Sequence, residues 1–181
     1  MGNQVFIING SGGVGKDAFV QLVNNCVWET CIVGNYSSVS KVKEIAEAIG
    51  WDGTKTERNR KFLSDLKMLT TEYNDMPLND MKRFTSDFMI NEYNMPKILF
   101  LHIREPQEIA KALYAFKKYN AKAILIKRDS VKQITSNIAD GSVYDFDYDI
   151  VVNNDGTLEE LKEKVECFLN DFIHNTLKNE Y

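Results

Sequence analysis

A glycine-rich segment near the start of the chain has the residue types and spacing of a loop that binds phosphate. The segment follows the pattern Gly-x-x-x-x-Gly-Lys and consists of Gly10, Ser11, Gly12, Gly13, Val14, Gly15 and Lys16, with Asp17 and Ala18 after it. Glycines let the backbone approach a ligand closely, so that N–H groups can point at phosphate oxygens. The lysine would bridge the β- and γ-phosphates of a nucleoside triphosphate. We therefore predict a nucleotide-binding site; the alternative is an incidental glycine turn before a helix.

The residue after the lysine is unusual for such a loop. Phosphate loops place Ser or Thr at this position, where the hydroxyl binds Mg²⁺, but this chain has Asp17 followed by Ala18. A carboxylate is a good ligand for a hard cation. We predict that Asp17 helps to hold Mg²⁺. The alternative is that Asp17 only places negative charge in the first helical turn, which the helix dipole favours.

The surrounding segments predict strands that alternate with helices. Short apolar runs indicate strands at residues 5–8, 31–33, 98–103, 123–126 and 149–152. Helical spacing of apolar residues follows the loop, and further helices are expected at residues 41–49, 105–119 and after residue 157. This alternation favours an α/β fold, in which helices cover both faces of a parallel sheet. Residues 51–95 are too long for a plain crossover between the second and third strands, so we expect a helical side lobe there.

The segment GSGGVGKD resembles the phosphate loops of P-loop kinases of the nucleoside monophosphate type. Its Gly-Lys-Asp variant is similar to that of phage deoxynucleoside monophosphate kinases and animal-type phosphomevalonate kinases. The resemblance continues with Arg104 after the third expected strand, Arg128 after the fourth, and residues 153–156 after the fifth.

This resemblance implies a single kinase domain over residues 1–181 with the three-layer P-loop fold. Its sheet would have five parallel strands in the order 2-3-1-4-5. Residues 51–95 would form an inserted acceptor-binding lobe, and residues 129–146 would form a lid. The implied reaction transfers the γ-phosphoryl group of ATP, with Mg²⁺, to a small phosphorylated acceptor.

Two arginines that follow expected strands are candidates for catalysis together with Lys16. Ligands bind beyond the carboxyl ends of the strands in open α/β sheets. Arg104 is therefore the candidate for the acceptor phosphate and the transition state, and Arg128 for the triphosphate at the lid entrance. The resembling family has Asp-x-Arg where this chain has His102-Ile103-Arg104, so Asp17 or Glu105 would replace the missing aspartate. We expect His102 to be a packed strand residue.

Further candidates come from the expected lobe and from the turn after the fifth strand. The acceptor candidates are Trp51, Asp52, Arg58 and Arg60. Arginine contacts phosphate with two N–H groups, tryptophan can stack on a base, and aspartate can accept from a base edge or a hydroxyl. The alternatives are a solvated basic helix face and a tryptophan in the core. The adenine candidates are Asn153, Asp155 and Gly156; this polar turn also precedes the last helix.

Composition and charge narrow the possible partners. The chain has 181 residues, of which 44% are hydrophobic and 27% charged, and a net charge of −4. This charge argues against binding to nucleic acid polymers or membrane surfaces. Three scattered cysteines form no CxxC pair and indicate a reduced, cytoplasmic setting.

The resulting prediction is a nucleoside monophosphate kinase, either a monomer or a homodimer. The alternatives are a kinase of another phosphorylated metabolite, such as phosphomevalonate, and an ATP-binding sensor without efficient turnover. The missing hydroxyl after Lys16, the missing strand-end aspartate and the absence of arginine from residues 129–146 motivate the sensor.

Overall fold

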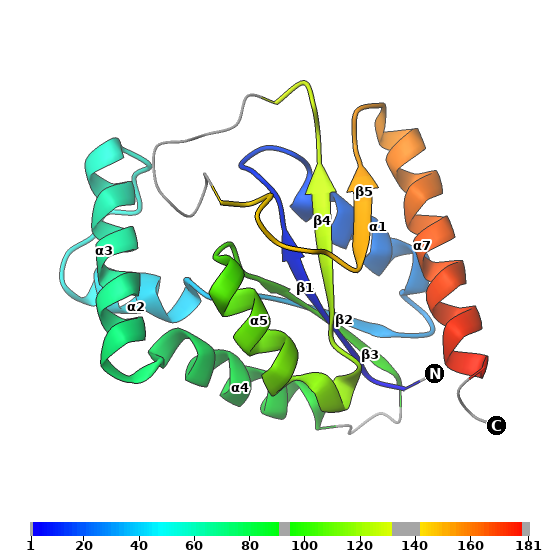
Figure 1. The fold of residues 1–181 in the computed structure, drawn as a ribbon, viewed down its shortest axis with the longest axis horizontal. Helices are drawn as coiled ribbons and strands as arrows, with labels where there is room; N and C mark the ends of the chain where they lie inside the picture. Colours follow the sequence, from blue (N-terminus) through cyan, green and yellow to red (C-terminus); the bar gives the residue numbers. More distant parts are fainter. Residues whose placement is uncertain (1, 91–94, 132–141, 179–181) are drawn as a thin grey trace.

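The computed structural model describes residues 2–90, 95–131 and 142–178, with side chains described as far as residue 171. Residues 132–141, most of the expected lid, and residues 91–94 of the expected lobe lie outside the described residues. Five parallel strands form one sheet in the order β2-β3-β1-β4-β5, which confirms the predicted fold (Figure 1). The strands are β1 (Gln4–Asn9), β2 (Ile32–Ser37), β3 (Lys97–His102), β4 (Lys122–Lys127) and β5 (Ile150–Asn153).

Helices cover both faces of this sheet. On one face, α1 (Lys16–Val27) and α7 (Leu158–Lys178) pack against Phe6 and Ile8 of β1. On the other face, α4 (Met76–Met89) and α5 (Pro106–Ala115) pack against Val5 and Ile7. Successive side chains of a strand point to opposite faces. Both faces of β1 are covered, and its residues 5–8 accordingly form a continuous apolar run. This burial anchors the strand that leads into the phosphate loop.

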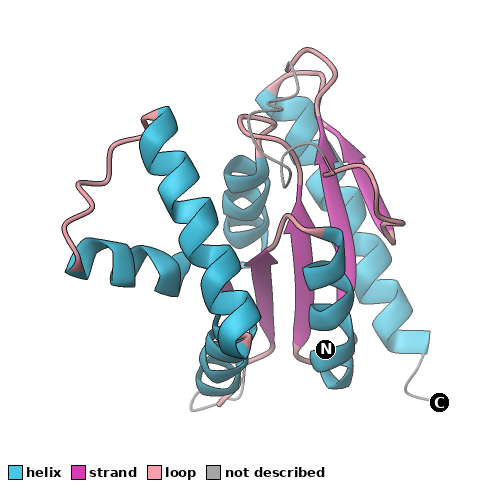
Figure 2. Cartoon of the chain, turned by 60° about the vertical axis from the view of Figure 1, so that its left-hand side comes forward, coloured by secondary structure: helices cyan, strands magenta, loops and turns pink. Residues whose placement is uncertain are grey.

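Two helices stand beside the sheet (Figures 1 and 2). They are α2 (Ser40–Ala48) and α3 (Glu57–Asn74), which contact each other and α4. The N–H of Asn59 donates to Oγ1 of Thr56 at 3.2 Å, which caps the start of α3. At the other end Asp75 adopts a φ of 53°, and the chain enters α4 with Pro77 in its first turn. The break near Met76-Pro77 therefore separates the helix beside the sheet from the helix on its face.

A short 3₁₀ turn, η1 (Lys117–Tyr119), connects α5 to β4. The three cysteines are free, with Cys31 buried and the other two exposed. Within the described ranges, no helix is both long enough and apolar enough to cross a membrane.

Candidate active site

The phosphate loop joins the carboxyl end of β1 to the first turn of α1, at the edge of the sheet where all five parallel strands end. The φ angles are 145° at Gly10, 82° at Gly13 and 99° at Gly15. A Cβ atom at Gly10 would lie 2.3 Å from the carbonyl oxygen of Ile126, and one at Gly15 would lie 2.4 Å from Nδ2 of Asn154. Only glycine fits these positions without strain. The glycines are therefore required by the loop conformation itself.

Lys16 reaches back over this loop. Its Nζ donates to the carbonyl oxygen of Gly10 at 2.5 Å and to that of Ser11 at 2.8 Å. The Ser11 side chain is buried, and its hydroxyl has no hydrogen-bond partner among the described residues. A buried hydroxyl without a partner costs free energy that a ligand oxygen could recover. With the positive end of the α1 dipole at the same point, these groups fit a bound phosphate.

A buried asparagine clamps the loop from the side of β5. Asn154 donates from Nδ2 to the carbonyl oxygen of Val14 at 2.8 Å, and its backbone N–H donates to the carbonyl oxygen of Lys127 at 2.6 Å. The residue is only 5% exposed. Sequence reasoning placed this residue in a polar turn and missed the clamp, because the contact spans most of the chain.

A second asparagine ties the loop to β3 and to the segment before β5. Oδ1 of Asn9 accepts from the N–H of Gly10 at 2.8 Å, and Nδ2 donates to the carbonyl oxygen of Arg104 at 3.0 Å and to the hydroxyl of Tyr148 at 2.7 Å. That hydroxyl in turn donates to the carbonyl oxygen of Val143 at 2.6 Å. Burial raises the pKa of Tyr148 to about 12, so the phenol stays protonated. The only signal in the sequence was a polar residue at the end of an apolar strand.

His102 ends β3 beside the loop, paired in register with Ile8 of β1. Its Nε2 is buried and has no hydrogen-bond partner in the described part of the chain. Burial lowers the pKa of His102 to about 4; the charge of Asp17 opposes this shift, and the charges of Lys16 and Arg104 reinforce it. A neutral imidazole therefore occupies the position of the missing aspartate. The charges of three predicted site residues, Asp17, Lys16 and Arg104, therefore act on this imidazole.

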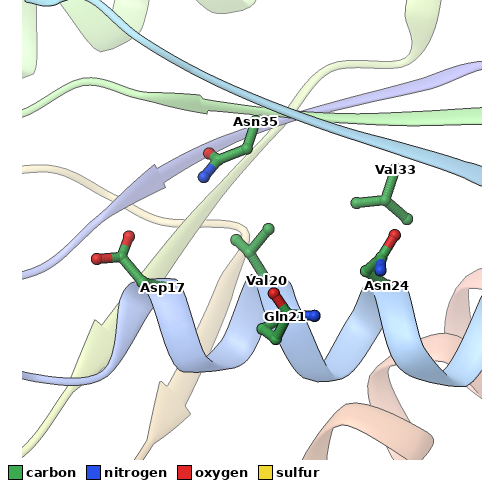
Figure 3. Close-up of a pocket in the computed structure, with 6 residues that line it drawn as sticks. All are labelled: Asp17, Val20, Gln21, Asn24, Val33 and Asn35. Atoms are coloured by element: carbon green, nitrogen blue, oxygen red, sulfur yellow. The ribbon is translucent and has the colours of Figure 1, made fainter.

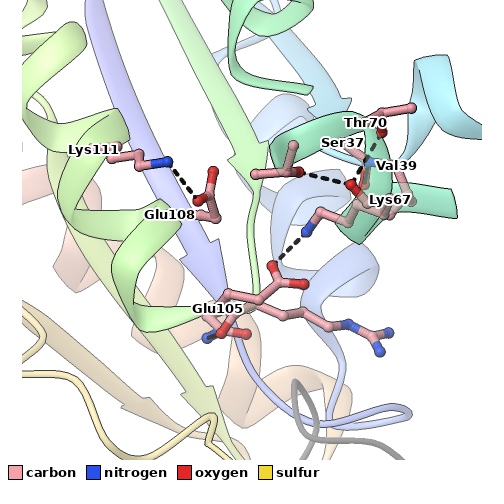
Figure 4. Close-up of polar contacts among 10 residues, drawn as sticks. Ser37, Val39, Lys67, Thr70, Glu105, Glu108 and Lys111 are labelled. Atoms are coloured by element: carbon pink, nitrogen blue, oxygen red, sulfur yellow. Dashed lines mark hydrogen bonds and ion pairs between the residues drawn. The ribbon is translucent and has the colours of Figure 1, made fainter. Parts of the chain in front are cut away.

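Glu105, the other carboxylate expected to replace that aspartate, is held in an ion pair. Its partner is the ammonium of Lys67, the one buried residue of α3, a helix that lies wholly within the described residues (Figure 4). The Lys67 side chain is 9% exposed and that of Glu105 is 28% exposed. The pair joins the helix beside the sheet to the end of β3. Asp17, in contrast, is exposed and forms no ion pair with any described residue.

The predicted acceptor residues lie around the start of α3. Arg58 and Arg60 are exposed in or next to its first turn. Trp51 is half-buried, and its Nε1 has no hydrogen-bond partner among the residues described. The Asp52 carboxylate accepts from the backbone and hydroxyl of Thr54 and from Asn59, which lowers its pKa. The described hydrogen bonds and ion pairs include none from these four predicted residues to the phosphate loop.

The predicted adenine residues and Arg128 lie at the ends of β4 and β5. Arg128 donates from Nε to the hydroxyl of Ser130 at 3.2 Å, and Oδ1 of Asp155 accepts from the N–H of Asp129 at 2.6 Å. The carbonyl oxygen of Asn153 accepts from Lys164 at 2.5 Å. Gly156 precedes the cap of α7, where the Thr157 hydroxyl accepts from the N–H of Glu160 at 3.3 Å and the Glu160 carboxylate accepts from the N–H of Thr157 at 3.1 Å. The turn therefore starts the last helix whatever else it binds.

A metal at this site would depend on the ligands of a bound nucleotide. Across the described ranges, no group of three or more His, Cys, Asp and Glu side chains is arranged to hold a metal ion. Mg²⁺ in nucleotide sites needs only one or two carboxylates besides phosphate oxygens and water. The exposed Asp17 carboxylate, one residue from Lys16, fits that requirement.

Several solved structures share this fold over nearly the whole chain. A gluconokinase from Sinorhizobium meliloti 1021 has a TM-score of 0.52 and 8% identity, covering 99% of this chain and 98% of its own. The APS kinase CysC of Mycobacterium tuberculosis, in complex with AMPPNP and APS, has a TM-score of 0.51 and 11% identity, covering 93% and 98%. A shikimate kinase from Aquifex aeolicus has a TM-score of 0.50 and 15% identity, covering 96% and 99%.

Sequence comparison adds no closer relative. No protein-family model and no curated protein sequence matches the chain. At identities this low, the structural similarity establishes the fold, which is that of P-loop kinases.

Proposed function

We propose that the chain is a kinase that transfers the γ-phosphoryl group of ATP to a small phosphorylated acceptor, and that this acceptor is a nucleoside monophosphate. The observation that supports this most strongly is the phosphate loop, with its left-handed glycines and the Lys16 ammonium over the Gly10 and Ser11 carbonyls. The fold is also that of three kinases of small metabolites, one of them solved with AMPPNP and APS.

The reaction requires positioning and positive charge more than covalent chemistry by the protein. The bond between the γ-phosphorus and the oxygen that bridges to the β-phosphorus breaks, and ADP leaves with the electron pair. An acceptor phosphate oxygen forms the new bond, and as an oxyanion it has no proton to release. Lys16 would stabilise charge on the β- and γ-phosphates, and Arg104 and Arg128 would stabilise charge on the acceptor and the triphosphate. Asp17, together with the phosphates, would hold Mg²⁺, which would supply further positive charge.

The remaining site residues would bind the two ends of the substrates. In this proposal Arg58 and Arg60 bind the acceptor phosphate, while Trp51 and Asp52 contact the rest of the acceptor. The adenine ring would lie against the turn that contains Asn153, Asp155 and Gly156. We also propose that the protein works in the cytoplasm as a monomer or homodimer.

One observation favours a second candidate function, an ATP-binding sensor with little turnover. The strand-end position that carries an aspartate in the resembling family holds the neutral His102, and the nearby Glu105 is paired with Lys67. These features leave Asp17 as the carboxylate for the metal. A sensor would bind ATP but would not consume it faster when acceptors are added.

The test is an ATP-consumption assay with Mg²⁺ across all ribo- and deoxyribonucleoside monophosphates and phosphomevalonate, with Lys16→Ala as the blank. Turnover with one nucleoside monophosphate, absent in the variant, is the expected result. Turnover with phosphomevalonate alone would support a kinase function but contradict a nucleoside monophosphate as the acceptor. ATP binding without turnover for any acceptor would contradict the kinase proposal and favour the sensor.

A further inference from the structure

A polar pocket opens beside the phosphate loop, between α1 and the edge strand β2 (Figure 3). It has a volume of about 250 Å³ and is lined by Asp17, Val20, Gln21, Asn24, Val33 and Asn35. We call these six residues the amide groove. The groove begins next to Lys16, because Asp17 is the following residue, and it runs along α1 away from the loop.

The helix face that lines this groove is polar where packing against a strand would favour apolar residues. Asp17, Gln21 and Asn24 lie at spacings of four and three residues and so share one stripe of α1. Asn35 faces them from β2, as Figure 3 shows. Only Val20 and Val33 give the groove an apolar wall.

The hydrogen-bonding groups of the groove are largely unused by the residues that the structure describes. Asp17, Asn24 and Asn35 form no side-chain hydrogen bond or ion pair with any described residue, whereas Gln21 donates its Nε2 to Oδ1 of Asn25 at 3.1 Å. An amide offers a donor and an acceptor side by side. The groove therefore presents to a ligand the two complete amides of Asn24 and Asn35, and the oxygen and second N–H of Gln21.

The charge of the groove disfavours a phosphate inside it. None of its six residues is basic, and the Asp17 carboxylate at its mouth would repel an anion that has no bound cation. Paired amide donors and acceptors match the edge of a nucleobase, and valine side chains can pack against the face of a planar ring. The volume is below the range of about 300–1,000 Å³ that holds a drug-sized ligand, so it suits one ring system rather than a whole nucleotide.

We propose that the amide groove binds the uncharged base of a nucleoside acceptor and directs the acceptor phosphate towards the phosphate loop. Asn24 and Asn35 would read the base edge, with Val20 and Val33 against the ring. The proposal rests on the kinase function. It assigns the base of the acceptor to this groove in place of Trp51 and Asp52, and it leaves the anionic half to the arginines.

The test uses binding of uncharged nucleosides, which needs no turnover. Adenosine, guanosine, cytidine, uridine and thymidine are titrated into the protein by NMR, with AMPPNP and Mg²⁺ in excess to occupy the ATP site. We expect one nucleoside to shift the side-chain amide signals of Asn24 and Asn35. Shifts confined to residues outside the groove, or no binding by any nucleoside, would overturn the proposal.

The nucleoside affinity of variants provides a second test of the groove. Asn24→Leu and Asn35→Leu keep the side-chain size but remove the amides, so nucleoside affinity should fall by at least about tenfold in each. ATP affinity should stay unchanged, and the exposed Asn170→Leu on α7 serves as the matched control. Equal nucleoside affinity in the groove variants and the control would refute the groove. If the groove binds nucleosides but the protein transfers no phosphoryl group, only the kinase function is refuted.

Discussion

His102 should make the stability of the protein fall steeply below neutral pH. Its pKa in the folded protein is about 4, against an ordinary value of 6.5, because the imidazole is buried at the end of β3. Between these two values the unfolded chain binds a proton that the folded protein does not, so acid favours unfolding. Each unit of pKa corresponds to about 1.4 kcal/mol. The loss of unfolding free energy is therefore about 2 kcal/mol at about pH 5, and about 3.4 kcal/mol once the pH is below both values.

The assay is urea unfolding of the wild type and His102→Gln at about pH 8 and about pH 5. The glutamine has no proton to bind in this range, so the difference between the two pH values should shrink by about 2 kcal/mol in the variant. His174→Gln, which removes the other histidine of the chain, is the control for losing a histidine. Equal pH dependence in the wild type and His102→Gln would refute the buried, neutral imidazole.

Substitutions at three further residues, Asp17, Asn154 and Lys67, test the site. Asp17→Ala should lower Mg²⁺-dependent activity at least about tenfold, while Asp17→Ser, which supplies the usual hydroxyl, should keep most of it; an unchanged magnesium titration in the alanine variant would leave this residue only a helix-terminus role. Asn154→Ala removes the clamp on the loop and should lower the free energy of unfolding by about 1–3 kcal/mol, measured by urea denaturation. It should also weaken ATP binding, measured by calorimetry. Lys67→Met leaves Glu105 without its partner and should lower the free energy of unfolding by about 2–3 kcal/mol. This is somewhat less than the loss on breaking a fully buried pair, because the carboxylate is 28% exposed. The exposed Lys61→Met, which breaks an ion pair on the same helix, should cost less than about 0.5 kcal/mol; equal effects of the two lysine variants in urea unfolding would contradict the buried pair.

The sheet could be predicted because a strand that is buried on both faces consists of consecutive apolar residues, a pattern that is visible in the local sequence. The central strands are continuous apolar runs, and the expected segments fall within or next to the observed strands. β2 extends beyond its expected end at Val33, through Gly34 and Asn35, which are poor strand formers. A Cβ at Gly34 would lie 2.6 Å from the ring of Phe88, so the packing of α4 as it stands favours glycine there. That preference is tertiary and is invisible in the local pattern.

The site could be predicted only where a motif is local. The phosphate loop is one contiguous segment, and its glycines carry the pattern. Asn9, Asn154 and Lys67 owe their roles to partners far away in the chain, at Arg104, Val14 and Glu105. Such contacts depend on which strands are neighbours, and sequence spacing does not encode them.

The most direct measurement follows the fate of the phosphoryl group. ATP labelled in its γ-phosphoryl group is incubated with Mg²⁺, one nucleoside monophosphate at a time, and either the wild type or Lys16→Ala, and the products are separated by chromatography. We expect the label to move to one nucleoside monophosphate with the wild type and to stay in ATP with the variant. Label that stays in ATP or appears only as inorganic phosphate with every acceptor would contradict a nucleoside monophosphate kinase, and transfer that survives in Lys16→Ala would contradict the role of the phosphate loop.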